Sequence, residues 1–271
     1  IPSENFISEN VKKALGSCLS NKYAEGYCGR RYYQGNKVMD QIESKCQERA
    51  LKAFGLDENV WGVNVQPHSG CEANLAVYNG LLDPGDKIMA MFLPDGGHLS
   101  HGWHTDKKVT LVSKIYEVEF YKVDPKTEVF DYDQIQKQAE IFRPKLIISG
   151  GTAYPREIDY KKMGEIARAV GAYYLADVSH EAGLIAGKVL SGPWMAAEVV
   201  TMTTHKTLRG PRGAMIFAKR IFMEAINKSV FPGLQGGPHM QTIAAIAVAL
   251  EETQTEEFGK YVEQVVKNAK K

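Results

Sequence analysis

The sequence predicts an α/β domain built on a mostly parallel sheet. Short apolar runs of strand length alternate with helical patterns along most of its 271 residues. Strands that are apolar along their whole length are buried on both faces, which is typical of parallel sheets covered by helices. The composition supports a globular chain, because it is 44% hydrophobic and 24% charged.

The first part of the chain predicts two helices around a long loop. Ser8 is a suitable N-cap for a helix that runs to about Leu19. Residues 21–37 are rich in Gly, Tyr, Arg and Asn, and so long a loop in a compact domain is usually functional. Apolar residues then recur at helical spacing from Val38 to Phe54, where Gly55 ends the pattern.

Short apolar runs and helical patterns continue from residue 62 onward. The predicted strands are 62–66, 87–92, 109–113, 145–149, 172–176, 198–202 and 214–218. Helices are expected from Ser69-Gly70 to Leu82, over 131–142, and over 159–170, where Asp159 is the N-cap and Gly171 the C′ residue. The stretch from Gly237 to the end predicts one long helix.

Charge and cysteine content exclude several classes of protein. With 33 basic and 32 acidic residues the net charge is +1, so nucleic acid is not expected as the main partner. No apolar run is long enough to cross a bilayer, and no signal peptide is visible. The four cysteines are widely spaced and form no Cys-x-x-Cys pair, which is typical of reduced thiols in the cytoplasm; we expect no metal site.

Lys206 is the first candidate for catalysis. It lies in Thr203-Thr204-His205-Lys206-Thr207, just before Gly210-Pro211-Arg212-Gly213. A lysine held in a pocket loses part of its proton affinity and can attack a carbonyl, for example the aldehyde of pyridoxal phosphate, to form a Schiff base. A solvated surface lysine is the common alternative.

Two segments that follow predicted strands are candidates for holding such a cofactor. Ser69-Gly70-Cys71 opens a helix, where small residues and the helix dipole favour an anion such as a phosphate, although a plain turn has the same pattern. Asp177 ends a strand; as a buried carboxylate it needs a cation such as a protonated pyridine nitrogen, or else it caps the next helix.

Two loop residues complete the set of candidates. His98 follows Gly96-Gly97, which let the backbone approach a ligand, and its imidazole can stack on a flat ring. An ordinary loop histidine is the alternative, and metal binding is disfavoured by the lack of partners at ligand spacing. Glu25 lies among tyrosines, where a partly shielded carboxylate can act as acid or base; the alternative is a surface loop that binds a partner chain.

Together these segments resemble the serine hydroxymethyltransferase family, pyridoxal-phosphate enzymes of the aspartate-aminotransferase-like fold (fold type I). The resemblance runs in family order across nearly all of the chain. The matching segments are Ser3-Glu4-Asn5-Phe6, Asn21 to Tyr27, Arg31-Tyr32-Tyr33, Val65 to Gly70, Gly96 to Leu99, Asp177 to His180, Thr203 to Gly213 and Phe231 to Pro238.

The resemblance implies the large domain of a transferase that interconverts serine plus tetrahydrofolate and glycine plus 5,10-methylenetetrahydrofolate. It implies an N-terminal segment with a dimer-crossing loop over 1–36, a cofactor-binding domain over 37–238, and a long helix over 239–271 that leads to a small C-terminal domain absent from this chain. It also implies a cytoplasmic homodimer with shared active sites; a tetramer and an organellar location stay open.

Residue roles follow from the resemblance alone. Lys206 holds pyridoxal 5'-phosphate covalently, Asp177 pairs with its pyridine nitrogen, and His98 stacks on the ring. The phosphate is surrounded by Ser69, Gly70, Cys71 and His205, and Tyr23, Gly236 and Gly237 reach the phosphate in the neighbouring subunit. Glu25 transfers protons, Tyr33 assists exchange of the Schiff base, and Thr152 bonds the phenolic oxygen of the cofactor. Ser3 and His180 lie near the amino acid, Leu93, Gly97 and Leu99 line the folate side, and Arg212 has a supporting role.

Departures from the family pattern leave two alternatives open. The family has serine where this chain has Cys71, a weaker donor to phosphate, and serine where Thr152 keeps the hydroxyl. The substrate-carboxylate arginine of the family belongs to the absent small domain, so we expect poor turnover by this chain. The alternatives are a related pyridoxal-phosphate aldolase and an inactive fragment that binds the cofactor and dimerises.

Overall fold

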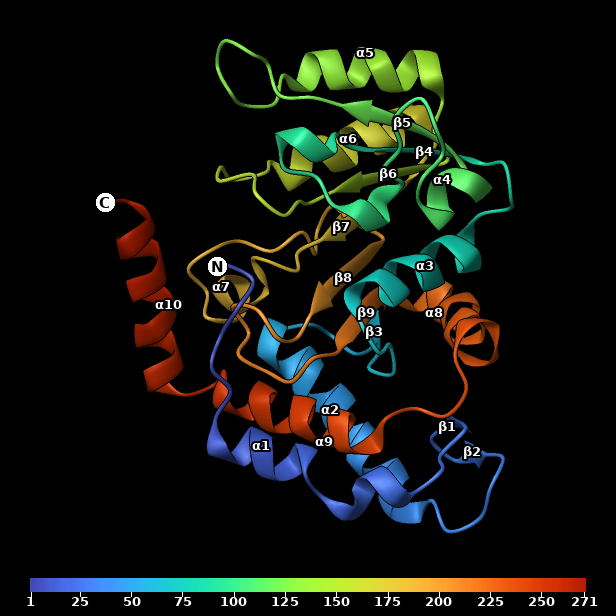
Figure 1. Ribbon diagram of the computed structural model, residues 1–271, viewed down its shortest axis with the longest axis vertical. Helices are drawn as coiled ribbons and strands as arrows, with labels where there is room; N and C mark the ends of the chain where they lie inside the picture. The colour runs from blue at the N-terminus through green and yellow to red at the C-terminus, as the bar shows by residue number, and fades with distance from the viewer. The chain divides into compact units, whose positions relative to one another are not determined.

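The computed structural model describes all 271 residues as an α/β fold, in which helices flank a seven-stranded mixed sheet (Figure 1). The predicted fold class is therefore confirmed. The strand order is β3-β9-β8-β7-β6-β4-β5. The strands are β3 (Trp61–Asn64), β4 (Lys87–Met91), β5 (Glu117–Tyr121), β6 (Leu146–Ser149), β7 (Tyr173–Asp177), β8 (Val199–Thr203) and β9 (Ala214–Lys219).

The chain divides into two compact units. Unit 1 comprises residues 1–80, 179–191 and 201–271, and unit 2 comprises residues 81–178 and 192–200. In unit 1, β3 pairs antiparallel with β9. In unit 2, β4 pairs parallel with β5 and β6, and β6 pairs parallel with β7. The parallel pairs bring the carboxyl ends of these strands to one edge.

Unit 1 is mostly helical. Its helices are α1 (Glu9–Leu15), α2 (Lys37–Phe54), α3 (Gly70–Leu81), α7 (Ala182–Ala186), α8 (Arg220–Lys228), α9 (Met240–Glu252) and α10 (Glu256–Ala269). Helix α9 packs against α1 and α2, as Figure 1 shows, and Val11, Ala245 and Ala249 are buried between α1 and α9. A short hairpin of β1 (Gly26–Tyr27) and β2 (Arg30–Arg31) interrupts the long loop before α2.

Unit 2 has helices α4 (Leu111–Ile115), α5 (Tyr132–Phe142) and α6 (Tyr160–Val170). Helix α5 packs against α6, and α6 also packs against β6 and β7. As predicted, the Asp159 side chain accepts a hydrogen bond from an N–H of the first turn of α6, and Gly171 ends the helix in the left-handed region. No helix of the chain combines the length and the apolar character needed to span a bilayer.

Three predictions about elements were wrong. The run 109–113 is not a strand, because Thr110 caps α4 by accepting the N–H of Ser113, and the strand of this region is β5 instead. The C-terminal stretch is two helices, because the Thr255 side chain accepts the N–H of Phe258 and starts α10 afresh. The first helix ends at Leu15, and a 3-10 turn over Cys18–Asn21 follows it.

Candidate active site

The turn after β8 in unit 1 holds Lys206 in a buried position. The N–H of Thr204 donates to the carbonyl of Gly213 at 3.0 Å, and the N–H of Arg209 donates to the carbonyl of Lys206 at 3.0 Å. The Asn5 side chain donates to the same Lys206 carbonyl at 3.0 Å. Only 8% of Lys206 is exposed. A lysine in a buried, hydrogen-bonded turn meets the requirement for an amine nucleophile and differs from a solvated surface lysine.

The start of α3 lies close against the end of β8. Gly70 is the first residue of α3, and a Cβ built on it would lie 2.6 Å from Cγ2 of Thr203. The Ser179 hydroxyl accepts the N–H of Thr203 at 3.1 Å. Glycine is therefore the residue that fits here, and Ser69 and the exposed Cys71 flank it at a helix N-terminus that favours an anion.

His205 is neutral near physiological pH. Burial, together with the charges of Arg212 and Lys206, lowers the pKa of His205 to about 4. The ring lines a cavity of about 490 Å³ to which Ser3, Asn5 and Arg212 also contribute. The structure thus brings the predicted residues Ser3, His205 and Arg212 to one hollow in unit 1.

The segment that carries His180 is packed against the lysine turn. The Thr207 hydroxyl donates to the carbonyl of His180 at 2.8 Å and accepts the N–H of Gly183 at 2.9 Å. A Cβ on Gly183 would lie 2.2 Å from the carbonyl oxygen of Thr207. Contact this close between two backbones fixes His180 relative to the turn.

Five predicted residues lie together where the loop before α2 meets the segment Gly236-Gly237. A Cβ built on Gly236 would lie 3.3 Å from a carboxylate oxygen of Glu25, and one on Gly237 would lie 3.4 Å from the ring of Tyr23. The rings of Tyr23 and Tyr33 meet edge to face at 5.6 Å. The charge of Glu25 raises the pKa of Tyr23 above its usual value. Tyr23 and Tyr33 are both about half exposed, at 59% and 51%.

In unit 2, Asp177 is a buried carboxylate at the carboxyl end of β7. Its Oδ2 lies 2.9 Å from Nε2 of His101, an imidazole that is 1% exposed. The ring of His98 meets that of His101 at 5.6 Å, and Nδ1 of His98 accepts the N–H of Ser100. Asp177 is therefore a buried carboxylate that is anchored by a buried imidazole.

Glycines join the turns that follow β4 and β6 in unit 2. The carbonyl of Gly96 accepts the N–H of Thr152 at 2.6 Å, and a Cβ on Gly151 would lie 2.4 Å from that same oxygen. A Cβ on Gly97 would lie 2.3 Å from the carbonyl of Met91. These contacts bring Thr152 and Gly97 to one edge of the sheet. Leu93 lies in the turn just before Gly97. Leu99, which is about half exposed, lies two residues after Gly97.

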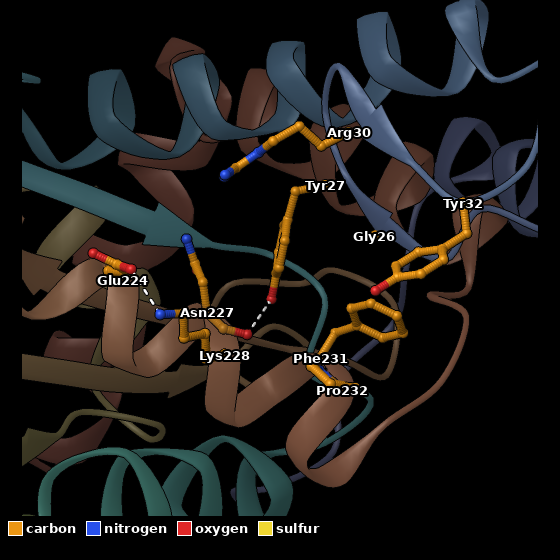
Figure 2. Close-up of a pocket in the computed structure, with 9 residues that line it drawn as sticks. All are labelled: Gly26, Tyr27, Arg30, Tyr32, Glu224, Asn227, Lys228, Phe231 and Pro232. Carbon is orange, nitrogen blue, oxygen red and sulfur yellow. Dashed lines mark hydrogen bonds and ion pairs between the residues drawn. The ribbon is translucent and has the colours of Figure 1, made fainter.

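A separate cavity of about 580 Å³ lies beside the loop of unit 1 (Figure 2). Its walls are the rings of Tyr27, Tyr32 and Phe231, and the ion pair of Lys228 with Glu224 stands at its side. None of the residues predicted for the site lines this cavity. It is therefore a neighbouring feature and not part of the candidate site.

The groups present suit a phosphorylated pyridine aldehyde. Unit 1 offers a buried amine, a neutral imidazole and a glycine-containing helix N-terminus, which suit an aldehyde and a phosphate. Unit 2 offers the buried carboxylate of Asp177, which suits a pyridinium nitrogen.

A family model for serine hydroxymethyltransferase matches residues 1–271. The chain belongs to the serine hydroxymethyltransferase family. It is 52% identical to a probable cytosolic serine hydroxymethyltransferase of Schizosaccharomyces pombe, covering 100% of this chain and 61% of that protein. It is 51% identical to serine hydroxymethyltransferase 3, chloroplastic, of Arabidopsis thaliana and to a putative mitochondrial one of Neurospora crassa, covering 52% of each.

The chain thus spans roughly half to three-fifths of the length of the relatives that it matches. The matches to the Schizosaccharomyces pombe and Neurospora crassa proteins include 100% and 99% of the residues of this chain, so the likeness to the serine hydroxymethyltransferase family extends over both units.

Sequence reasoning gave no role to several polar residues whose side chains the structure buries. In unit 2 it missed His101, although His98-x-x-His101 is a spacing that places both rings on one turn. In unit 1 it assigned no role to Arg31, Asn36 or Glu43, although Arg31 stands in one of the segments that resemble the family. The signal for Glu43 was present, because this glutamate occupies the apolar stripe of α2, where an unpaired charge is costly.

Proposed function

We propose that this chain is the cofactor-binding part of an enzyme that interconverts serine plus tetrahydrofolate and glycine plus 5,10-methylenetetrahydrofolate. The observation that carries the proposal is the buried Lys206 in the turn after β8, in a chain of the serine hydroxymethyltransferase family. Pyridoxal phosphate, linked to Lys206, is the proposed cofactor. When bound, it supplies an electron sink for bond cleavage at Cα of the amino acid.

Asp177 is proposed to accept the N–H of the protonated pyridine ring. The bond to His101 holds the Asp177 carboxylate in place, and its negative charge would keep the pyridine nitrogen protonated. A protonated ring withdraws electrons more strongly. His98 is proposed to stack on the ring face, and Thr152 to bond the phenolic oxygen. The support in unit 2 is the burial of Asp177 and its bond to His101.

The phosphate is proposed to bind at the start of α3. Ser69 and Gly70 offer hydroxyl and backbone N–H donors there, and Cys71 adds a weaker one. A neutral His205 can also donate one N–H to the phosphate without adding a charge. His180 is proposed to lie near the bound amino acid and to keep its place through the bond from Thr207.

Glu25 is proposed to move the proton of the substrate hydroxyl, with Tyr33 assisting transfer of the amino acid onto the cofactor. Support comes from the position of Glu25 beside Tyr23, where the carboxylate raises the pKa of the phenol. Ser3 is proposed to contact the amino acid, and Arg212 to support the lysine turn. The folate side is proposed to be lined by Leu93, Gly97 and Leu99.

A homodimer with shared sites is part of the proposal. Tyr23, Gly236 and Gly237 are proposed to reach the phosphate held by the second subunit. Their grouping with Glu25, and the exposure of Tyr23 and Tyr33, support a surface that another chain covers. Sedimentation of the purified chain tests this directly. A monomer at micromolar concentration would contradict a site shared between two subunits.

The visible spectrum tests the proposal as a whole. The chain mixed with pyridoxal phosphate should gain a yellow absorbance band, which Lys206→Ala abolishes and Lys228→Ala, at an exposed lysine, leaves unchanged. A band of equal strength in Lys206→Ala would show that the cofactor is held elsewhere. Cleavage of threonine without folate, with no response to serine, would favour the related aldolase instead.

A further inference from the structure

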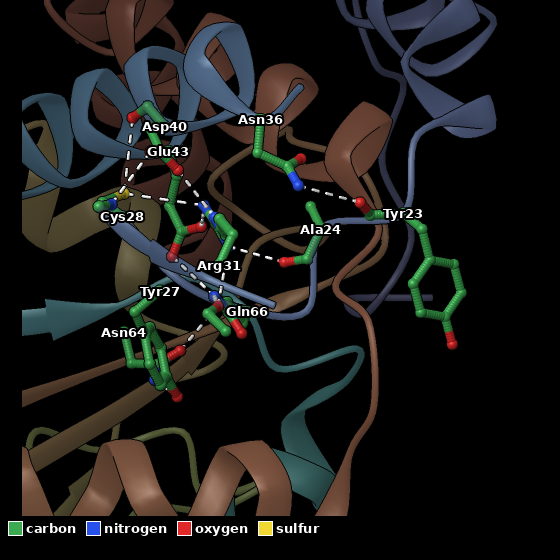
Figure 3. Close-up of polar contacts among 12 residues, drawn as sticks. Tyr23, Ala24, Tyr27, Cys28, Arg31, Asn36, Asp40, Glu43, Asn64 and Gln66 are labelled. Carbon is green, nitrogen blue, oxygen red and sulfur yellow. Dashed lines mark hydrogen bonds and ion pairs between the residues drawn. The ribbon is translucent and has the colours of Figure 1, made fainter. Parts of the chain in front are cut away.

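The loop that carries Glu25, residues 22–36, is held in place by buried polar side chains, including two of its own, Arg31 and Asn36 (Figure 3). One guanidinium nitrogen, Nη1 of Arg31, donates to the carbonyl oxygens of Ala24 and Gly26, both at 2.8 Å. These two residues are the chain neighbours of Glu25 on either side. The backbone on both sides of the proposed proton-transfer carboxylate is therefore fixed by a single rigid fork.

Arg31 is itself fixed by α2. Its Nε donates to Asp40 at 2.8 Å, and its Nη2 donates to Glu43. The side chain of Arg31 is 3% exposed and that of Glu43 is fully buried. Burial raises the pKa of Glu43, and the charge of Arg31 opposes that shift. Gln66 donates both to Glu43 and to the carbonyl of Gly26, so the loop, α2 and the strand end share one network.

A second anchor joins the two ends of the loop. The amide nitrogen of Asn36 donates to the carbonyls of Tyr23 at 3.2 Å and Tyr33 at 3.0 Å. Asn36 is buried and occupies the N-cap position of α2. Its two bonds bring the backbones of the two tyrosines together, and their rings meet edge to face.

Apart from the Cys28 thiol, which lies 3.8 Å from Nη2 of Arg31, both anchors bind the loop through its main-chain carbonyls. The side chains of Tyr23, Glu25 and Tyr33 are therefore not used to hold it, and Figure 3 shows the Tyr23 ring directed away from the anchors. Reactive groups on a loop that is ordered in advance avoid the entropic cost of ordering when a ligand arrives. A loop of this length without such anchors would sample many conformations.

We propose that Arg31 and Asn36 are positioning residues, which hold Tyr23, Glu25 and Tyr33 in the shape needed for hydroxymethyl transfer before any ligand binds. The importance of that shape rests on the proposed function. The anchoring itself is independent of it, and both tests below use the chain without cofactor.

The first test is hydrogen exchange of the loop. Arg31→Met combined with Glu43→Gln removes the fork without leaving a buried charge unpaired, and Arg30→Met is the matched control at the adjacent, exposed arginine. The N–H of Tyr32, which bonds the carbonyl of Glu25, should exchange about tenfold faster or more in the double variant. The buried amides of β9 and the whole loop of Arg30→Met should exchange as in the parent.

Unchanged exchange at Tyr32 would overturn the proposal. Equal acceleration across the loop and β9 would also overturn it, because the network would then serve general stability and not the loop. Asn36→Ala keeps the test decisive if the double variant fails to fold, since it removes one uncharged side chain. It should speed exchange at both ends of the loop and spare β9.

The second test reads the position of Glu25. The Glu25 charge raises the pKa of Tyr23, and Arg31 is not among the groups that shift it. Titration of carbon-13-labelled tyrosine by NMR, assigned with Tyr23→Phe, should find the pKa of Tyr23 falling toward its ordinary value in both anchor variants. Glu25→Gln sets the full size of that fall, and Arg30→Met should leave the pKa unchanged.

A Tyr23 pKa that stays raised in both anchor variants would refute a positioning role. If the anchors pass both tests while Lys206→Ala keeps the yellow band, the proposed function fails and the anchoring stands. If the band behaves as proposed and the anchors fail, the reverse holds.

Discussion

Gly70→Ala tests the cradle at the start of α3 with a single methyl group. The added Cβ would lie 2.6 Å from Cγ2 of Thr203, about 1 Å inside an ordinary carbon–carbon contact. Thr203 is 6% exposed and β-branched, so its side chain has little freedom to move away. Overpacking of this kind costs about 1–3 kcal/mol of folding stability.

A second substitution isolates the cause. Thr203→Ser deletes the clashing methyl, keeps the hydroxyl, and alone should cost about 1 kcal/mol for the lost burial. If the clash is the cause, the double variant should be about as stable as Thr203→Ser alone, so the two changes are coupled by about 1–3 kcal/mol. Urea unfolding of the four proteins, followed by circular dichroism with a shared slope, measures this coupling. Additive losses would refute the close approach.

Three further predictions concern single side chains. Burial lowers the pKa of His205 to about 4, so between pH 6.5 and 4 the unfolded chain binds a proton at this imidazole that the folded chain does not bind. The free energy of unfolding should therefore fall by about 1–2 kcal/mol as the pH falls from 6.5 toward 4, a value discounted for the partial exposure of the ring. Urea titrations should find this slope flattened in His205→Gln; equal slopes would contradict it. His101→Ala should cost about 2–3 kcal/mol in thermal unfolding by removing the donor to buried Asp177, and His101→Gln should cost less. Cys71→Ser should tighten pyridoxal phosphate binding about two- to fivefold in a spectral titration, because a hydroxyl is the better donor; weaker binding would count against a phosphate there.

Strands that are buried along nearly their whole length were predictable from the sequence, and a partly exposed strand was not. The run 145–149 was predicted as a strand, and β6 occupies 146–149 with every residue buried. In 109–113 the β-branched residues suggested a strand, but Val109 and Leu111 are more than half exposed, so a local cap decided the structure. Strand β5 alternates charged and apolar residues at the sheet edge, a weak pattern that sequence reasoning passed over.

The candidate site divides in the same way. Lys206, Asp177 and Gly70 stand in short motifs, whose chemistry is apparent in a few adjacent residues. Contacts such as Arg31 with Glu43 join distant segments, and no pattern of spacing specifies which carbonyl a buried guanidinium will bind. Only the fold brings these partners together. The charge of Glu43 in the apolar stripe of α2 did indicate that this glutamate has a buried partner, but not which residue the partner is.

The most direct measurement of the central claim is the site of cofactor attachment. The chain saturated with pyridoxal phosphate is reduced with borohydride to fix the linkage, digested, and mapped by mass spectrometry. We predict one modified peptide, in which Lys206 carries the label, and no label on the corresponding peptide of Lys206→Ala. Label at another lysine, or spread evenly over exposed lysines such as Lys228, would contradict it.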